Sequence, residues 1–243
     1  MRLGVSYFEG SNNLKVYPIF LNDLARRRCV VIGGGHEAER KVDGLLDCDA
    51  GVTVISASAT AQLRHWAESG RINWIDRDYR YGDLQGAFLV ICEGSDAEVN
   101  AQVWQEGEAA GALVNVMDDV AHCNFVAGSV VRQGPLVVSI STSGAAPALA
   151  VRLRQRLEQE LGPEYAIFLE MMQSLREPLA ARYPAFGERR DLWYRLVDSD
   201  VIDQLRAGRP EAAYRRVAEI VGFDVLAQAE RVEIKGWRLE IGD

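Results

Sequence analysis

The sequence reads Cys29-Val30-Val31-Ile32-Gly33-Gly34-Gly35-His36-Glu37-Ala38 from residue 29 to residue 38, and this stretch decides the fold. Its first four residues are apolar and mostly β-branched, which predicts a buried parallel strand. Gly33, Gly35 and Ala38 then form G-x-G-x-x-A at the start of a predicted helix. Gly33 permits a tight turn, Gly35 lets backbone N–H groups approach a pyrophosphate, and Ala38 lets helix pack on strand. We therefore predict a dinucleotide site. The alternative is a glycine-rich turn in another α/β protein, but the flanking strand and helix favour the dinucleotide.

The second predicted strand leaves the choice between NAD and NADP open. It reads Val52-Thr53-Val54-Ile55 and is followed by Ser56-Ala57-Ser58. An Asp or Glu at this position would bind the ribose 2′-hydroxyl of NAD. The sequence has neither.

Composition sets the broad class. The 243 residues are 48% hydrophobic and 26% charged, as in an ordinary globular protein of one or two domains. The sequence has no apolar run of membrane-spanning length and no signal-peptide pattern, so we expect a cytoplasmic protein without a membrane partner. Its net charge of −8 argues against a nucleic-acid partner. The four cysteines form no C-x-x-C, so we expect buried thiols and no structural zinc site.

Strands and helices alternate in the first half of the chain. Helices are expected at 37–49, 59–69 and 97–110, and further strands at 72–75, 86–92 and 112–116. This alternation predicts an α/β fold with a parallel Rossmann sheet, whose ligands bind at the carboxyl ends of the strands. Tyr17-Pro18-Ile19-Phe20, followed by Leu21-Asn22-Asp23-Leu24, is expected to pack on the sheet as a lead-in.

The pattern changes after Asp118. Residues 125–132 and 136–141 predict a two-stranded element, and helices are expected at 147–161, 165–179, 191–205 and 211–221. We therefore expect a Rossmann domain at 17–118, a small β dimerisation segment at 119–146 and a helical C-terminal domain at 147–221. The tail, 222–243, stays unassigned, although its alternating residues suggest a hairpin.

Several spaced motifs resemble the precorrin-2 dehydrogenase and sirohydrochlorin ferrochelatase family of sirohaem synthesis. The matching marks are Tyr17-Pro18-Ile19-Phe20, Val30 to Gly35 with Ala38-Glu39-Arg40-Lys41, Asp83-Leu84, Gly94-Ser95-Asp96 with Asn100, Asn115-Val116-Met117-Asp118, Phe125-Val126, and Ser139 to Gly144 with Pro147 and Leu149-Ala150. The resemblance covers residues 17–161.

The resemblance implies NAD-dependent oxidation of precorrin-2 to sirohydrochlorin, often followed by insertion of ferrous iron in the same site, and a homodimer. It implies cofactor contacts at Gly33, Gly35, His36, Glu37, Ala38, Ala57, Ser58, Gly94 and Ser95. It also gives Asp118 the role of acid/base and transient metal-directing group.

The residues themselves support a site for an anionic substrate. Asp118 follows a strand at the sheet's carboxyl edge, where it could take a proton as hydride leaves to NAD. The alternative is a turn residue that caps backbone, a role that Asp119 could also fill. Substrate contacts are expected at Ser141, Thr142, Ser143 and Arg152, because a helix that opens there offers free N–H donors. The resemblance adds Asn115, in the strand that ends before Asp118. Arg152 could equally lie on a solvated helix face.

We expect no resident metal, because His122 and Cys123 are neighbours on an extended chain and point to opposite faces. Two alternatives to the bifunctional enzyme remain. One is a dehydrogenase with a separate chelatase, and the other is a non-catalytic NAD(H)-sensing protein.

Overall fold

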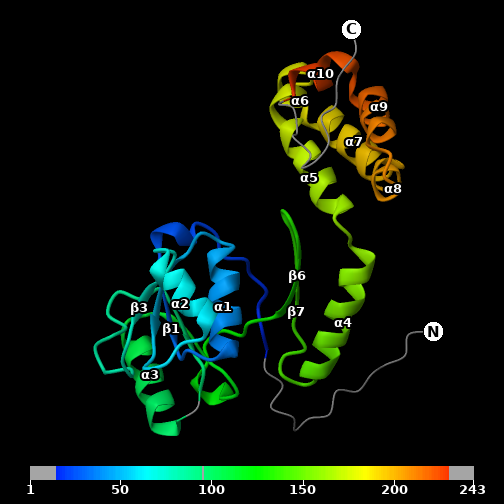
Figure 1. Ribbon diagram of the computed structural model, residues 1–243. Helices are drawn as coiled ribbons and strands as arrows, with labels where there is room; N and C mark the ends of the chain where they lie inside the picture. Colours follow the sequence, from blue (N-terminus) through cyan, green and yellow to red (C-terminus); the bar gives the residue numbers. More distant parts are fainter. Residues whose placement is uncertain (1–14, 95, 230–243) are drawn as a thin grey trace, which may run out of the picture. The chain divides into compact units, whose positions relative to one another are not determined.

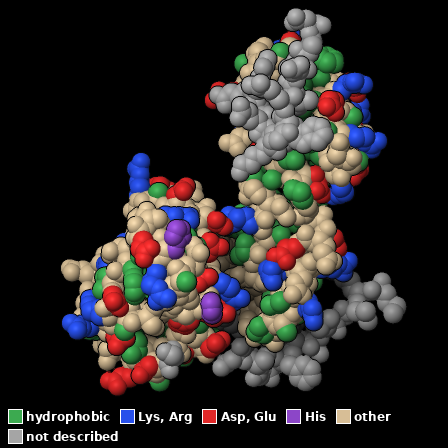
Figure 2. Space-filling view, viewed as in Figure 1, with side chains coloured by type: hydrophobic (Ala, Val, Ile, Leu, Met, Phe, Trp, Pro, Cys, Tyr) green, Lys and Arg blue, Asp and Glu red, His purple; other side chains and the backbone are tan. Residues whose placement is uncertain are grey.

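The computed structural model describes residues 15–94 and 96–229, which form two compact units, the first ending at Ala127 and the second beginning at Gly128. Within these residues, no helix is long and apolar enough to cross a membrane. The predicted site residue Ser95 and residues 230–243 of the tail lie outside the described residues. Figure 2 shows acidic and basic side chains interspersed on the visible face of each unit.

The first unit is built on a five-stranded parallel sheet in the order β3-β2-β1-β4-β5, which confirms the predicted Rossmann class (Figure 1). Its elements are η1 (Leu24–Arg26), β1 (Arg28–Ile32), α1 (His36–Leu46), β2 (Gly51–Ile55), α2 (Ala61–Glu68), β3 (Asn73–Ile75), β4 (Leu89–Cys92), α3 (Ala97–Ala109), β5 (Leu113–Val116) and η2 (Val120–His122). The predicted strands and helices are all present, with ends shifted by a few residues.

The two faces of the sheet have separate cores, because successive side chains of a strand point to opposite faces. On one face, Cys29 and Val31 of β1 pack with residues of α1 and α2. On the other face, Val30 and Ile32 pack with Val103 of α3. β1 is therefore buried on both faces, as its continuous apolar run requires.

Strand register brings the carboxyl ends together. Ile32 of β1 pairs with Ile55 of β2 and with Cys92 of β4, and Cys92 pairs with Val116 of β5. Ile75, the last residue of β3, pairs with Ile55, so all five strands end at one level. The strand order reverses between β1 and β4, which is where ligands of such sheets bind.

The second unit contains an antiparallel hairpin and a set of helices. Its elements are β6 (Ser129–Gln133), β7 (Leu136–Ile140), α4 (Pro147–Glu160), α5 (Glu164–Ser174), α6 (Arg176–Arg182), α7 (Phe186–Val197), α8 (Val201–Arg206), α9 (Pro210–Val221) and α10 (Phe223–Gln228). Helix α4 packs against both strands of the hairpin. Helices α5 to α10 share a hydrophobic core that includes Phe168, Leu196 and Val217.

Two helices predicted as continuous are each divided in two. The helix expected at 165–179 is interrupted at Leu175, because Pro178 has no N–H to continue the helical bonding to Ser174. The helix expected at 191–205 begins earlier, at Phe186, and ends at Val197. Ser199 causes this break: its hydroxyl donates to the Leu196 carbonyl at 2.7 Å and accepts from the Val201 N–H at 3.3 Å.

Two further expectations concern the ends of the chain. The lead-in, residues 17–24, was predicted to pack on the sheet. This is wrong for Tyr17, Ile19 and Phe20, which are exposed, and confirmed for Leu24 of η1, which is buried in the core beside β1 and β2. In the tail, residues 223–228 form α10, whereas the alternating stretch that suggested a hairpin lies outside the described residues.

Candidate active site

The glycine turn joins β1 to α1. Gly33 has a φ of +116°, a left-handed conformation that favours glycine, and its N–H donates to the Ile55 carbonyl at 3.0 Å. Gly35 is the N-cap of α1, so its N–H lies at the positive end of the helix. Ala38 is fully buried and lets the helix lie close to the sheet. The local geometry is that expected for close approach of a pyrophosphate.

The loop after β2 lies against this turn. The Thr60 N–H donates to the Gly34 carbonyl at 3.0 Å, and a Cβ at Gly34 would overlap the Ser58 carbonyl oxygen. The structure thus brings Ser58, and with it Ala57, to the glycine turn. Their contact with a cofactor remains a prediction. Sequence reasoning gave no role to Gly34, whose need for glycine depends on this long-range contact.

The first turn of α1 presents two other predicted cofactor residues. His36 is exposed, and its Nδ1 lies 3.8 Å from Glu39 Oε2. Glu37 pairs with Arg40 on the same helix. Both side chains are at the surface beside the glycine turn, and their role in binding also remains a prediction.

A second close approach joins the ends of β4 and β5. Gly94 has a φ of +75°, and a Cβ there would overlap the Met117 carbonyl oxygen. Asp118 follows directly in a turn with a φ of +60°, and its side chain is exposed. The predicted cofactor residue Gly94 and the predicted catalytic residue Asp118 therefore lie at the same edge of the sheet.

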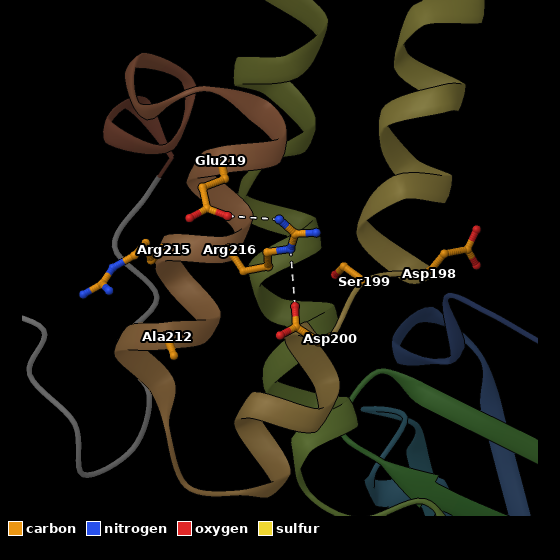
Figure 3. A pocket seen from close by; sticks show the side chains of 7 residues that line it. All are labelled: Asp198, Ser199, Asp200, Ala212, Arg215, Arg216 and Glu219. Atoms are coloured by element: carbon orange, nitrogen blue, oxygen red, sulfur yellow. Dashed lines mark hydrogen bonds and ion pairs between the residues drawn. The ribbon is translucent and has the colours of Figure 1, made fainter.

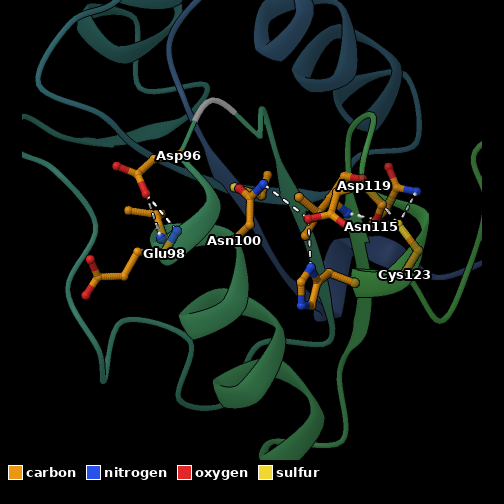
Figure 4. Close-up of polar contacts among 10 residues, drawn as sticks. Asp96, Glu98, Asn100, Asn115, Asp119 and Cys123 are labelled. Carbon is orange, nitrogen blue, oxygen red and sulfur yellow. Dashed lines mark hydrogen bonds and ion pairs between the residues drawn. The ribbon is translucent and has the colours of Figure 1, made fainter.

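Asp119 is held by neighbouring side chains (Figure 4). Its Oδ2 lies 2.7 Å from His122 Nδ1 and accepts from Nδ2 of the buried Asn100 at 3.4 Å. The hydrogen bond with His122 is the main cause that lowers the pKa of Asp119. The Asp119 carboxylate is thus held by side chains, and it makes no capping hydrogen bond to the backbone of η2.

The segment after Asp119 is tied to β5. Cys123 Sγ donates to the Val116 carbonyl at 3.2 Å, and Asn124 Oδ1 accepts from the Val114 N–H at 2.7 Å. Asn115 Nδ2 donates to the Phe125 carbonyl at 3.0 Å. The Asn115 amide therefore holds this segment, and its predicted contact with substrate remains untested.

His122 and Cys123 contact different groups, namely the Asp119 carboxylate and the backbone of β5. Across residues 15–94 and 96–229, no group of three or more His, Cys, Asp and Glu side chains is arranged to hold a metal ion.

The other predicted substrate residues belong to the second unit. Ser141 Oγ accepts from the Ser143 N–H at 3.1 Å, and Thr142 Oγ1 accepts from the Ala146 N–H at 3.2 Å, just before α4. The hydroxyls therefore shape the loop that opens the helix. Arg152 lies on the exposed face of α4 and bonds Gln155 Oε1 at 3.0 Å.

A pocket in the second unit is lined by none of the predicted site residues (Figure 3). It is lined by Asp198, Ser199, Asp200, Ala212, Arg215, Arg216 and Glu219. Arg216 at its centre pairs with Asp200 at 3.3 Å and with Glu219 at 3.0 Å. Arg216 is thus neutralised by the two carboxylates, and we assign no role in the predicted reaction to this pocket.

Sequence reasoning also missed Glu93. It is the residue between β4 and Gly94, and its Oε2 accepts from the Gly35 N–H at 3.0 Å. A charged residue directly after a buried strand was the available signal.

The sheet order and the glycine turn define a nucleotide-binding protein of the Rossmann class, and comparison with known proteins gives the family. Residues 20–129 match the family model described as putative NAD(P)-binding. Residues 133–160 match the sirohaem biosynthesis protein central region, and residues 164–220 match the sirohaem synthase dimerisation region. The chain belongs to the family that joins these three regions in this order.

Individual relatives agree with this family. The chain is 36% identical over 202 residues to siroheme synthase 1 of Aeromonas salmonicida, covering 83% of this chain and 43% of the relative. It is 34% identical over 219 residues to siroheme synthase 3 of Aeromonas hydrophila, covering 90% of this chain and 47% of the relative. The chain thus spans less than half the length of these curated relatives.

A solved structure supports the fold. The structure of SirC, a precorrin-2 dehydrogenase, matches with a TM-score of 0.70 at 22% identity, covering 84% of this chain and 100% of that chain. At this identity the match concerns the fold.

Proposed function

We propose that this chain catalyses the NAD-dependent oxidation of precorrin-2 to sirohydrochlorin in the cytoplasm. The observation that carries the proposal is the close approach of Gly94 to the Met117 carbonyl, because it puts Asp118 at the edge where the glycine turn lies. Support comes also from the family, whose regions cover most of the chain.

Different residues of the first unit bind the cofactor and accept the proton. The Gly35 N–H and the positive end of α1 bind the cofactor's pyrophosphate. NAD, when bound, supplies the acceptor for a hydride from the tetrapyrrole. Asp118 takes the proton that leaves with this two-electron oxidation. The Asp118 side chain is exposed at the edge of the sheet, where a substrate can reach its carboxylate.

We extend the proposal to insertion of ferrous iron into sirohydrochlorin in the same site. Iron is then a substrate that Asp118 directs transiently, and the chain needs no resident metal. Asn115, Ser141, Thr142, Ser143 and Arg152 are proposed to bind the substrate. The working form is proposed to be a homodimer without nucleic-acid or membrane partners.

The decisive experiment mixes the full chain with precorrin-2 and NAD and follows the absorbance of NADH. Formation of NADH and sirohydrochlorin in equal amounts is expected. A protein that binds NAD but forms no NADH is a sensor rather than a dehydrogenase. Addition of ferrous iron to sirohydrochlorin, without NAD, tests the chelatase step separately. No acceleration over the protein-free mixture would leave a dehydrogenase only.

Two neighbouring variants test the catalytic carboxylate. Asp118→Asn keeps the shape of the side chain but removes the proton acceptor, so both rates should fall about a hundredfold to ten-thousandfold with unchanged NAD affinity. Asp119→Asn is the matched control, because its carbonyl oxygen can still accept from Asn100. If Asp119→Asn abolished both reactions while Asp118→Asn left them within a few fold, the assignment would be wrong by one residue. Loss of oxidation with intact chelation would restrict Asp118 to the first reaction.

A further inference from the structure

The side chain of Glu93 lies across the glycine turn. Its Oε2 accepts from the Gly35 N–H at 3.0 Å. A Cβ built on Gly33 would lie 2.5 Å from both Cβ and Oε2 of Glu93, and one built on Gly35 would overlap Oε1. The carboxylate therefore fills the space that the absence of side chains at Gly33 and Gly35 creates.

That space has a specific use in a sheet of this class. The second glycine of the motif lets a pyrophosphate approach the backbone, and the N–H groups at the helix start donate to it. Glu93 uses the same donor and benefits from the same positive helix end. A carboxylate and a pyrophosphate are both anions, so they cannot share this position.

The backbone around Glu93 is fixed, whereas its carboxylate is not. The Glu93 N–H donates to the Ile32 carbonyl at 2.8 Å, which holds the residue at the end of the sheet. The side chain is half-buried, and its hydrogen bond to Gly35 is the one that must break when it leaves. Rotation about the side-chain bonds can therefore vacate the turn without unfolding it.

We propose that Glu93 occupies the pyrophosphate position in the unliganded chain and determines the affinity for the dinucleotide. This inference rests on the proposed NAD site. Binding requires the carboxylate to leave the Gly35 N–H, and the lost charge-assisted hydrogen bond is subtracted from the binding free energy. Glu93 thus keeps the cofactor affinity lower than the glycine turn alone would give.

The test is calorimetric titration of the full chain with NAD and, separately, with ADP-ribose. Glu93→Gln removes the charge but keeps the size of the side chain. It should bind both probes about tenfold more tightly than the parent, equivalent to about 1.4 kcal/mol. ADP-ribose has the pyrophosphate but no nicotinamide, so an equal gain for both probes locates the effect at the phosphates. Glu93→Ala, which empties the position, should gain at least as much.

The control is Glu98→Gln, which makes the same change of charge on an exposed residue of the α3 first turn. Its affinity for both probes should equal that of the parent. If Glu98→Gln gained as much affinity as Glu93→Gln, the cause would be the change in net charge rather than the position of Glu93, and the inference would be overturned. Unchanged or weaker binding by both Glu93 variants, with the parent still binding, would overturn the inference and leave the NAD site standing. A parent and variants that all bind neither probe would overturn the proposed function together with it.

Discussion

Replacement of Gly34 by alanine tests the geometry of the glycine turn most directly. A Cβ at this position would overlap the Ser58 carbonyl oxygen, which is backbone and cannot rotate away. The two loops would have to separate by roughly 1 Å or more to restore normal contact. Such overpacking costs about 1–3 kcal/mol, and strain on the Thr60 to Gly34 hydrogen bond adds about 0.5–1.5 kcal/mol. We therefore expect Gly34→Ala to lose about 1.5–4.5 kcal/mol of unfolding free energy.

The same change should weaken NAD binding at least tenfold, because it displaces the neighbouring Gly35 N–H, and a hydrogen bond to a charged group contributes about 1.5–3 kcal/mol. Urea unfolding and calorimetric titration measure the two effects. Gly44→Ala in α1 is the matched control: a Cβ there meets nothing within 4 Å, so it should stabilise the chain by about 0.5–1 kcal/mol. If Gly34→Ala unfolded and bound NAD like the parent, the reasoning on loop contact would be refuted.

Three other changes test separate parts of the chain. Arg77 donates two hydrogen bonds to Asp83, at 2.7 Å to each carboxylate oxygen, and they lower the pKa of Asp83. The ionised carboxylate therefore stabilises the fold at pH values above its unfolded pKa of about 3.9. This stabilisation is lost as the pH falls through the lowered pKa of the folded state. The difference in unfolding free energy between the parent and Asp83→Asn should shrink between pH 6 and pH 3, and a constant difference would contradict this. Glu106→Ala should lower the free energy of unfolding in urea by about 1–3 kcal/mol. The buried Leu84 N–H donates to Glu106 Oε1 at 2.6 Å, and the change leaves it without an acceptor. A stability equal to the parent's would contradict this. Sedimentation should give a homodimer at micromolar concentration, and a monomeric parent would exclude the dimer. Leu149→Arg, at an exposed apolar position of α4, should convert the dimer to monomer if this face of α4 belongs to the dimer interface.

Sequence patterns predicted the sheet well because its strands are buried on both faces. Such strands read as apolar runs, as Cys29 to Ile32 does, and the polar residues that follow them mark the carboxyl edge. The limits of β4 were less clear. The strand begins at Leu89 rather than at Gly86, because the Ala87 N–H closes a turn on the Leu84 carbonyl before the strand starts.

The helical second unit was harder to predict, because single side chains decide where helices stop. The Ser199 hydroxyl bonds the Leu196 carbonyl and the Val201 N–H, and so competes with the hydrogen bonds of a continuous helix. The spacing of apolar residues does not reveal this competition. The contact of Glu93 with Gly35 joins residues that are 58 positions apart. It depends on the register of Ile32 with Cys92, which the sequence of either strand alone does not specify.

The central position of β1 in the sheet also affects folding during synthesis on the ribosome. β1 pairs with β2, the next strand to be made, and with β4, which follows only after β3 and a long loop. Until residues 89–92 emerge, the nascent chain carries one edge of β1 without hydrogen-bond partners, and such edges invite pairing with other chains. Pairing between distant segments is slow. A translational pause that keeps residues 89–92 inside the ribosome should therefore increase aggregation, whereas a pause after the whole first unit has emerged should not.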